Sequence, residues 1–201
     1  MLGPIFSALT GLSNATKRLQ NSANNLANLQ TSGFKKGEVI NIENKSGGTR
    51  VNSITKSNTQ GGFIPTKNPL DLAIQGGGFF QVANPNGGIS FTRSGRFNLN
   101  GAGQVVDASG NILTPEVNVP RANNGIIVGA NGQVSVQTPA GLEVTGQIQL
   151  ANFNNPAGLI AAGGNLFHES AASGAPIMGI PGEGALGSVV AGFLEGSNVD
   201  I

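Results

Sequence analysis

Residues 1–34, MLGPIFSALTGLSNATKRLQNSANNLANLQTSGF, decide the fold. Apolar residues recur there every seven positions in two series offset by four, which is the spacing of a coiled-coil seam. With Pro4 suited to a first helical turn and Gly33 to the left-handed position past a helix end, the pattern predicts a helix from about Pro4 to about Ser32. The seam residues are Ile5, Leu12, Leu19 and Leu26 in one series and Leu2, Leu9, Thr16, Ala23 and Gln30 in the other.

The remaining faces of this helix are nearly uncharged. Lys17 and Arg18 are the only charged residues in the segment, whereas a helix on a solvated surface normally carries charge on its outer side. We therefore expect the helix to be surrounded by protein. In this interpretation, one polar series points outward from the seam: Ser7, Asn14, Asn21 and Asn28.

Three asparagines, Asn24, Asn25 and Asn28, cluster near the predicted end of the helix. Asparagine is a poor helix former, but its side-chain amide both donates and accepts hydrogen bonds. We interpret the cluster as a set of partners that fix register in an assembly. The alternative, an asparagine-rich frayed end, leaves the upstream periodicity unexplained.

Composition indicates a mainly β protein punctuated by glycine. The 201 residues include 32 glycines, no Trp, no Tyr and no Cys, and 10% are charged. Without cysteine there is no disulfide framework and no thiolate metal site. We expect neither a Sec-type signal peptide nor a membrane span, because no basic region precedes an apolar run and no apolar run is long enough.

Charge is divided between the two parts of the chain. Residues 1–67 hold eight Lys/Arg and two Asp/Glu, a net +6, and residues 68–201 hold three and eight, a net −5. This division suits head-to-tail contact between identical subunits, and a basic patch for nucleic acid is a second interpretation. The lysines are spread thinly along the sequence, with few aromatic residues between them for base stacking. We therefore favour a third interpretation, in which these charges lie on a solvated linker, over both the subunit contact and the nucleic-acid patch.

The rest of the chain divides into three parts. Residues 34–67 predict an extended connector with edge strands at Val39–Ile42 and Val51–Ile54. Residues 68–185 predict an all-β domain of hairpins, which begins with two strands joined at a glycine bend, Gly76–Gly78. Residues 186–201 form a short C-terminal return segment with a strand at Val189–Leu194.

Within the β domain, Asn-Gly pairs predict tight turns with positive φ. The pairs are Asn86-Gly87, Asn100-Gly101, Asn124-Gly125 and Asn131-Gly132. The longest uninterrupted strand is predicted at Leu142–Phe153.

The sequence offers little chemistry. His168 is the only histidine, so neither a two-histidine metal site nor a Cys–His pair can form. Gly182–Gly187 matches a G-x-G-x-x-G pattern but lacks a surrounding βαβ unit, and we interpret it as a glycine-rich turn. We expect no catalytic residues, no metal and no cofactor. An enzyme is the least favoured class, because no set of titratable groups converges.

Three stretches together resemble the flagellar rod and hook protein family. In SALTGLSNATKRLQNSANNLANLQTSGFKK, a helix leads into an Asn-Asn-x-Ala-Asn-x-x-Thr-x-Gly-Phe-Lys element that includes Gly33, Phe34 and Lys35. NPLDLAIQGGGFFQV and FTRSGRFNLNGAGQVVDASGNIL are similar to the opening of the family's central β domain. GALGSVVAGFLEGSNVDI is similar to its re-entry into the C-terminal segment, with Glu195, Ser197, Asn198 and Val199 on the motif.

The resemblance implies a structural subunit of the flagellar basal body, exported unfolded through the flagellum's own type III apparatus, that polymerises helically and supports motility. It implies identical subunits and other rod or hook proteins as partners, with no nucleic acid, no membrane insertion and no small-molecule substrate. The layout is nearest to that of distal rod subunits, because hook proteins carry a further outer β domain. Proximal rod or hook-type subunits are the alternatives within the family, and a secreted glycan-binding β module is the alternative outside it.

Family members continue past the Ser-Asn-Val element into a C-terminal helix that is absent from this sequence, so we expect another subunit to cover the leucine seam or the helix to melt. The resemblance and the periodicity together predict a self-assembly set: Ile5, Leu9, Leu12, Leu19, Leu26, Asn24, Asn25, Asn28, Gly33, Phe34, Glu195, Ser197, Asn198 and Val199.

Overall fold

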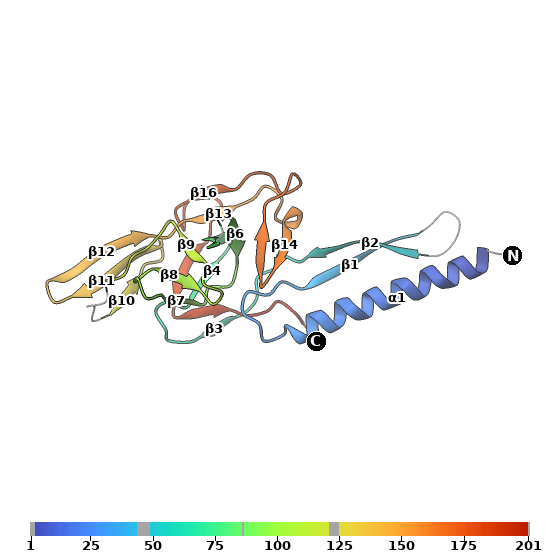
Figure 1. Cartoon of the computed structure of the whole chain (residues 1–201), viewed down its shortest axis with the longest axis horizontal. Helices are drawn as coiled ribbons and strands as arrows, with labels where there is room; N and C mark the ends of the chain where they lie inside the picture. Colours follow the sequence, from blue (N-terminus) through green and yellow to red (C-terminus); the bar gives the residue numbers. More distant parts are fainter. Residues whose placement is uncertain (1–2, 44–48, 86, 121–124, 201) are drawn as a thin grey trace.

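The computed structural model describes residues 3–43, 49–85, 87–120 and 125–200. The molecule is elongated: a helix and a β-hairpin extend from one end, a β body occupies the middle, and a small sheet forms the opposite end (Figure 1). Among the described residues the fold is mainly β with one N-terminal α-helix, and this confirms the predicted fold class.

Helix α1 spans Gly3–Ala27, so the predicted end at Ser32 is wrong. After Ala27 the backbone continues in tight turns, one of which bonds the N–H of Thr31 to the carbonyl of Asn28 (3.1 Å). Asn25 accounts for the early end, because its side-chain amide donates to the carbonyl of Gly37 (3.0 Å) and accepts from the N–H of Gly37 (2.9 Å). The chain therefore turns back along the helix instead of extending it.

The polar face of α1 is the face that packs within the chain. Asn14 is only 6% exposed, and Asn21 donates to the carbonyl of Gly37 (2.7 Å). The prediction that the series containing these two residues points outward is therefore wrong. The physical reason is that amide side chains can pair with backbone groups of the adjoining strands, whereas the leucines on the opposite face cannot.

The connector forms a hairpin alongside α1 (Figure 1). Strands β1 (Gly37–Glu43) and β2 (Thr49–Lys56) pair antiparallel and contain the two predicted edge strands, which confirms those strands. The connector ends in β3 (Phe63–Pro65), which pairs with β18 (Phe193–Glu195). The connector and the C-terminal return segment are thus joined directly.

The return segment also enters the body as a strand. Strand β17 (Ser188–Ala191) pairs antiparallel with β4 (Leu72–Gln75). Gly192, at φ 80°, separates β17 from β18, so the single strand predicted at Val189–Leu194 is in fact two. Each half pairs with a different strand, and this change of partner is the reason for the break.

The central sheet of the body is antiparallel, with the order β14-β15-β6-β5-β9-β8-β7, and β13 joins β5 and β16 beside it. The predicted glycine bend between β4 and β5 is confirmed, with Gly76 at φ 111° and Gly78 at φ 121°. A short 3-10 turn, Pro156–Gly158, precedes β14. The strand bounds are β5 Phe79–Ala83, β6 Ile89–Thr92, β7 Phe97–Leu99, β8 Val105–Asp107, β9 Ile112–Thr114, β13 Leu150–Asn152, β14 Ile160–Gly163, β15 Leu166–His168 and β16 Ile177–Gly179.

A three-stranded antiparallel sheet forms the end of the molecule opposite α1 (Figure 1). Its strands are β10 (Ile126–Val128), β11 (Gln133–Thr138) and β12 (Gly141–Gln147). The long strand predicted at Leu142–Phe153 is wrong, because Ile148 leaves β12, is 1% exposed in the core, and bonds through its N–H to the carbonyl of Gly132. The chain passes from one sheet to another at this point.

Two of the four predicted Asn-Gly turns fall partly outside the described residues, at Asn86 and Asn124. Gly132 has the predicted positive φ, 79°. At Asn100-Gly101 the positive φ belongs instead to Gly103 (84°), because the Asn100 side chain accepts the N–H groups of Ala102 and Gln104 and shapes the turn itself.

The core lies inside the β body. One cluster includes Leu72, Phe80, Phe97, Val134 and Ile148, all 1% exposed or less, so it spans both the central sheet and the far sheet. A second cluster is aromatic, with Phe79 packed edge-on against Phe153 and Phe167 at centroid distances of 5.9 and 6.0 Å. The body therefore holds its own hydrophobic core without help from α1.

The anchoring role of Asn25 is testable. We expect Asn25→Ala to speed hydrogen exchange of the Gly37 N–H roughly thirtyfold, because two hydrogen bonds worth about 1 kcal/mol each are lost. Asn24→Ala is the matched control, since Asn24 is exposed on the same helical turn and the change in helix propensity is the same. Equal exchange rates in the two variants, measured by NMR, would contradict the assignment.

Candidate functional site: the junction of the terminal segments with the body

Glu195, the last residue of β18, lies at the centre of the junction and is 0% exposed. Its Oε1 is 2.7 Å from Lys35 Nζ, and its Oε2 is 2.8 Å from Arg93 Nε. The N–H of Gly61 also donates to Oε1 (3.1 Å). One carboxylate thus joins four segments: the one after α1, the one between β2 and β3, the one after β6, and the C-terminal return segment.

The two cations are held by further hydrogen bonds. Arg93 donates to the carbonyls of Gly76 (3.0 Å) and Gly78 (2.6 Å) at the glycine bend, and also to that of Ile74 (3.3 Å). Lys35 donates to the carbonyl of Thr59 (2.7 Å). A buried ion pair is tolerated when its remaining donors and acceptors are satisfied in this way.

The three side chains of this network carry a net positive charge, because Lys35 and Arg93 share the single carboxylate of Glu195. Burial lowers the pKa of Lys35 below its ordinary value, the charge and hydrogen bond of Glu195 act in the opposite direction, and the charge of Arg93 lowers it further. The Lys35 ammonium therefore depends on Glu195 for its charged state.

Asn198 forms a second link between the return segment and the connector. Its Oδ1 accepts from the N–H of Lys36 (2.7 Å), and its Nδ2 donates to the carbonyls of Ser57 (3.1 Å) and Thr59 (3.0 Å). The backbone N–H of Asn198 also donates to the carbonyl of Phe34 (3.3 Å). Every one of these partners lies beside Lys35 or β2, so Asn198 holds the base of the hairpin.

Gly33 allows the close approach of the two chain segments. Its N–H donates to the carbonyl of Glu195 (2.8 Å), and its φ is 70°. A Cβ at this position would lie 2.5 Å from the backbone nitrogen of Ser94. Beside it, the ring of Phe34 is 5% exposed, with Lys56 Nζ 4.5 Å from its centroid.

The predicted self-assembly residues fall into two groups. The junction brings together Asn25, Gly33, Phe34, Glu195 and Asn198 through contacts within the chain. Ser197 accepts the N–H of Val199 (3.3 Å) in the same segment, and Asn28 donates to the carbonyl of Asn24 (2.8 Å) at the end of α1. The second group lies along α1, apart from the junction, and is 62–72% exposed: Ile5, Leu9, Leu12, Leu19 and Leu26.

Sequence reasoning missed three contributors. Lys35 and Arg93 belong to the family motifs, but no role in the junction was predicted for either. Phe6 is absent from the predicted self-assembly set, although it is 63% exposed beside the leucines. The available signal for the two cations was their position: Lys35 follows Phe34, Arg93 follows the strand residues Phe91 and Thr92, and charged side chains that come to be buried beside such residues are usually paired. Nothing local in the sequence indicates that they pair with the same carboxylate.

The described residues include no group of three or more His, Cys, Asp or Glu side chains suited to a metal ion. His168 has its Nδ1 3.2 Å from the carbonyl of Ile89, at the edge of the central sheet. Gly182–Gly187 forms a turn closed by a bond from the N–H of Gly182 to the carbonyl of Gly187 (3.0 Å), consistent with the predicted glycine-rich turn. No helix in the described part of the chain has the length and apolar character needed to cross a membrane.

The candidate site is thus a structural junction, in which a helix with an exposed apolar face is joined to a β body by a buried ion-pair network. Residues 73–136 match the family described as flagellar hook protein FlgE/F/G D1 domain. The chain is 34% identical to the flagellar basal-body rod protein FlgG of Agrobacterium fabrum, over 96% of this chain and 84% of that protein. It is 32% identical to the FlgG of Bacillus subtilis, over 100% of this chain and 86% of that protein.

The flagellar hook protein FlgE of Salmonella typhimurium is 35% identical over 53% of this chain and 28% of that protein. The chain belongs to the family of flagellar basal-body rod proteins FlgG, the distal rod family. It is therefore a structural, non-enzymatic subunit of the flagellar basal-body rod.

The buried carboxylate is expected to contribute strongly to stability. Glu195→Gln leaves two buried cations without a counter-ion, so we expect a loss of about 3–5 kcal/mol in the free energy of unfolding, measured by urea denaturation. Glu38→Gln is the control, because the Lys36–Glu38 pair (3.3 Å) is solvent-exposed and is worth less than about 1 kcal/mol. Similar losses in the two variants would show that the Glu195 network is not a buried electrostatic link.

The close approach at Gly33 gives a separate test. We expect Gly33→Ala to lower the free energy of unfolding by at least about 2 kcal/mol, because the new Cβ meets backbone atoms and the left-handed φ is unfavourable. Gly62→Ala is the control, since a Cβ there meets nothing within 4 Å. Thermal unfolding measures both, and a Gly33→Ala midpoint equal to that of the control would refute the proposed constraint.

Proposed function

We propose that this rod subunit self-assembles helically into the axial structure of the flagellum through the apolar face of α1, and that this assembly supports motility. We call that face, formed by Ile5, Leu9, Leu12, Leu19 and Leu26, the leucine ridge. One observation carries the proposal: the ridge is 62–72% exposed, while the opposite, polar face of the same helix is covered by the β1–β2 hairpin.

Energetics favour a covered ridge. Burial of each large apolar side chain is worth about 1.5–3 kcal/mol, so a ridge of five leaves a large stabilisation unused in the single chain. Most of the stability of a protein helix comes from packing of its apolar face, and the described part of the chain leaves this face of α1 62–72% exposed. Neighbouring copies supply the missing packing.

The junction gives the assembly its geometry. Glu195 and Asn198 tie the base of α1 and the hairpin to the β body, so a helix held by its neighbours also fixes the position of the body. In this proposal residues 1–33 and 186–201 form the assembling segments, and the β body sets the spacing between subunits. Asn24, Asn28, Ser197 and Val199 lie at the edge of this junction, where a neighbour can reach them.

Membership of the rod family supports two further elements of the proposal. The partners are identical subunits together with other rod and hook proteins, and the chain reaches the rod through the flagellum's own type III export apparatus. A protein exported unfolded must fold at the growing tip, and a β body with its own core can do so before the ridge is covered.

The ridge is directly testable. We expect Leu12→Asp combined with Leu19→Asp to abolish motility and rod assembly, because charged side chains cannot be buried against a neighbour without a partner. The β body should remain folded, as shown by an unchanged β signal in circular dichroism. Light scattering of the purified chain should show loss of self-association.

The matched control is Arg18→Asp combined with Ser22→Asp, since both residues are exposed on α1 and neither lines the groove formed with Leu9 and Leu12. This control places two aspartates on the same helix and should retain assembly. Wild-type motility in the Leu12/Leu19 variant, or equal loss in both double variants, would refute assembly through the ridge.

A further inference from the structure

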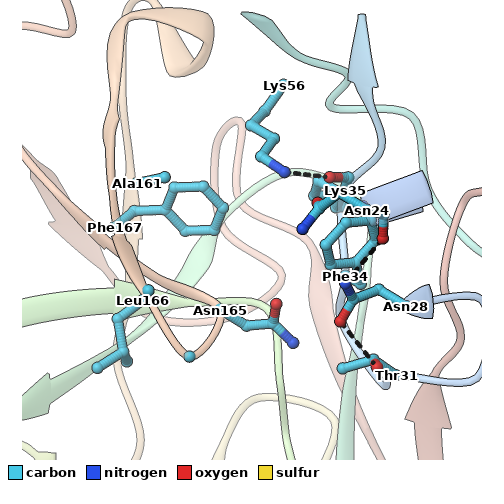
Figure 2. Close-up of a pocket in the computed structure, with 12 residues that line it drawn as sticks. Asn24, Asn28, Thr31, Phe34, Lys35, Lys56, Ala161, Asn165, Leu166 and Phe167 are labelled. Atoms are coloured by element: carbon cyan, nitrogen blue, oxygen red, sulfur yellow. Dashed lines mark hydrogen bonds between the residues drawn. The ribbon is translucent and has the colours of Figure 1, made fainter. Parts of the chain in front are cut away.

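A pocket of about 360 Å³ lies between the end of α1 and the turn that joins β14 to β15. Asn165 in that turn bridges the two walls, because its side-chain amide donates to the carbonyl of Ser32 (3.1 Å). Figure 2 shows Asn24, Asn28, Thr31 and Phe34 along one wall, Ala161, Asn165, Leu166 and Phe167 along the other, and Lys56 reaching in from β2.

Lys56 brings a positive charge to this pocket. Its Nζ donates to the carbonyl of Lys35 (3.0 Å) and lies 4.5 Å from the centroid of the Phe34 ring. Its side chain is half-buried, and this burial lowers the pKa of the ammonium. Among the described residues the ion pairs are Lys35–Glu195, Arg93–Glu195 and Lys36–Glu38, and Lys56 belongs to none of them.

The surroundings do not neutralise this charge. Lys35 also lines the pocket, but Lys35 and Arg93 already share the single carboxylate of Glu195. Three cations therefore stand against one paired anion at the junction. An anion that enters the pocket gains a favourable interaction in a partly desolvated site, where Coulomb attraction is stronger than in water.

The other lining groups define the shape of that anion. Each side-chain amide of Asn24, Asn28 and Asn165 carries two N–H donors along the walls, of which Asn28 and Asn165 use one each within the chain. The hydroxyl of Thr31 donates to Oδ1 of Asn28 (3.2 Å) and holds that amide in place. The rings of Phe34 and Phe167, 5% and 6% exposed, supply apolar sides. This combination fits a short hydrocarbon stem that ends in an acceptor-only group, which is the side chain of glutamate or aspartate.

We propose that this pocket receives an acidic side chain from a second copy of the chain. The distribution of charge supports this source, because the pocket's cations lie in residues 1–67, with a net charge of +6, and residues 68–201 carry a net charge of −5. The acidic part includes three exposed carboxylates on the body and the far sheet that accept no hydrogen bond within the described part of the chain, Glu143, Glu169 and Glu183, whereas the exposed Glu116 already accepts from Gln104 and Asn118. The inference rests on the proposed function, since copies must meet for the pocket to be filled.

The pocket itself can be tested on the full chain without any assembly. We expect N-acetyl-glutamate amide to shift the side-chain amide signals of Asn24, Asn28 and Asn165 in a saturable manner at millimolar concentrations. The control is N-acetyl-glutamine amide, which has the same shape without the charge and should bind at least tenfold more weakly. Equal responses to the two compounds, or no saturable shift at these amides, would overturn the assignment of a carboxylate site.

The second copy is tested by sedimentation velocity over a series of salt concentrations. We expect Lys56→Met to lower the association constant about threefold to tenfold at low salt and to flatten its salt dependence, while Lys56→Arg keeps both. Circular dichroism checks that each variant is folded. Lys56→Glu should regain association when mixed with a chain carrying Glu143→Lys, Glu169→Lys or Glu183→Lys.

The outcomes separate this inference from the proposed function. Association that is lost in the Leu12/Leu19 variant but has wild-type salt dependence in Lys56→Met overturns the pocket contact alone. A wild-type chain that remains monomeric at every concentration overturns both. A Leu12/Leu19 variant that is monomeric yet still binds N-acetyl-glutamate amide supports both.

Discussion

The burial of the Glu195 carboxylate between Lys35 and Arg93 is the interaction on which the rest of the structure depends. The three residues belong to segments that are far apart in the sequence, and none of the three side chains is more than 5% exposed. Separation of any one segment leaves a charge in a region of low dielectric, at a cost of several kcal/mol. The direction of α1 is therefore set at its base, and Arg93 extends the same constraint to the glycine bend between β4 and β5.

This constraint explains how α1 can show its apolar side to the exterior. The helix is held by amide hydrogen bonds from Asn21 and Asn25 to the backbone of β1, and by the network at its end. Large exposed apolar patches on a soluble protein mark surfaces that bind other molecules. Polar contacts thus orient the helix within the subunit, and the leucine ridge stays exposed.

The sequence predicted features whose cause is local. The seven-residue spacing through Leu12, Leu19 and Leu26 predicted the helix and its apolar face, because periodicity depends only on neighbouring turns. Alternation in Val39–Ile42 predicted strand β1 in the same way. The helix end and the covered face were not predictable, because Asn25 and Asn21 are used by Gly37, which lies beyond the turn.

Features that depend on partners from distant segments were missed. The strands at Leu142–Phe153 and Val189–Leu194 each divide where the chain changes partner, and a single sequence carries no record of pairing. The pairing of Arg93 with Glu195 spans 102 positions, so the motifs that contain them were recognised separately and the contact between them was not.

The return segment ends beside the base of α1, the start of α1 lies at the free tip of that helix, and the far sheet of β10, β11 and β12 lies at the opposite end of the molecule (Figure 1). Topologically, the β body is a long excursion that leaves the junction after β3 and returns to it at β18. Insertions or deletions in the far sheet of β10, β11 and β12 change the length of the β body, while the ion-pair network at Glu195 keeps its geometry. A fold of this kind lets the length of the β body vary while the geometry of the junction is kept.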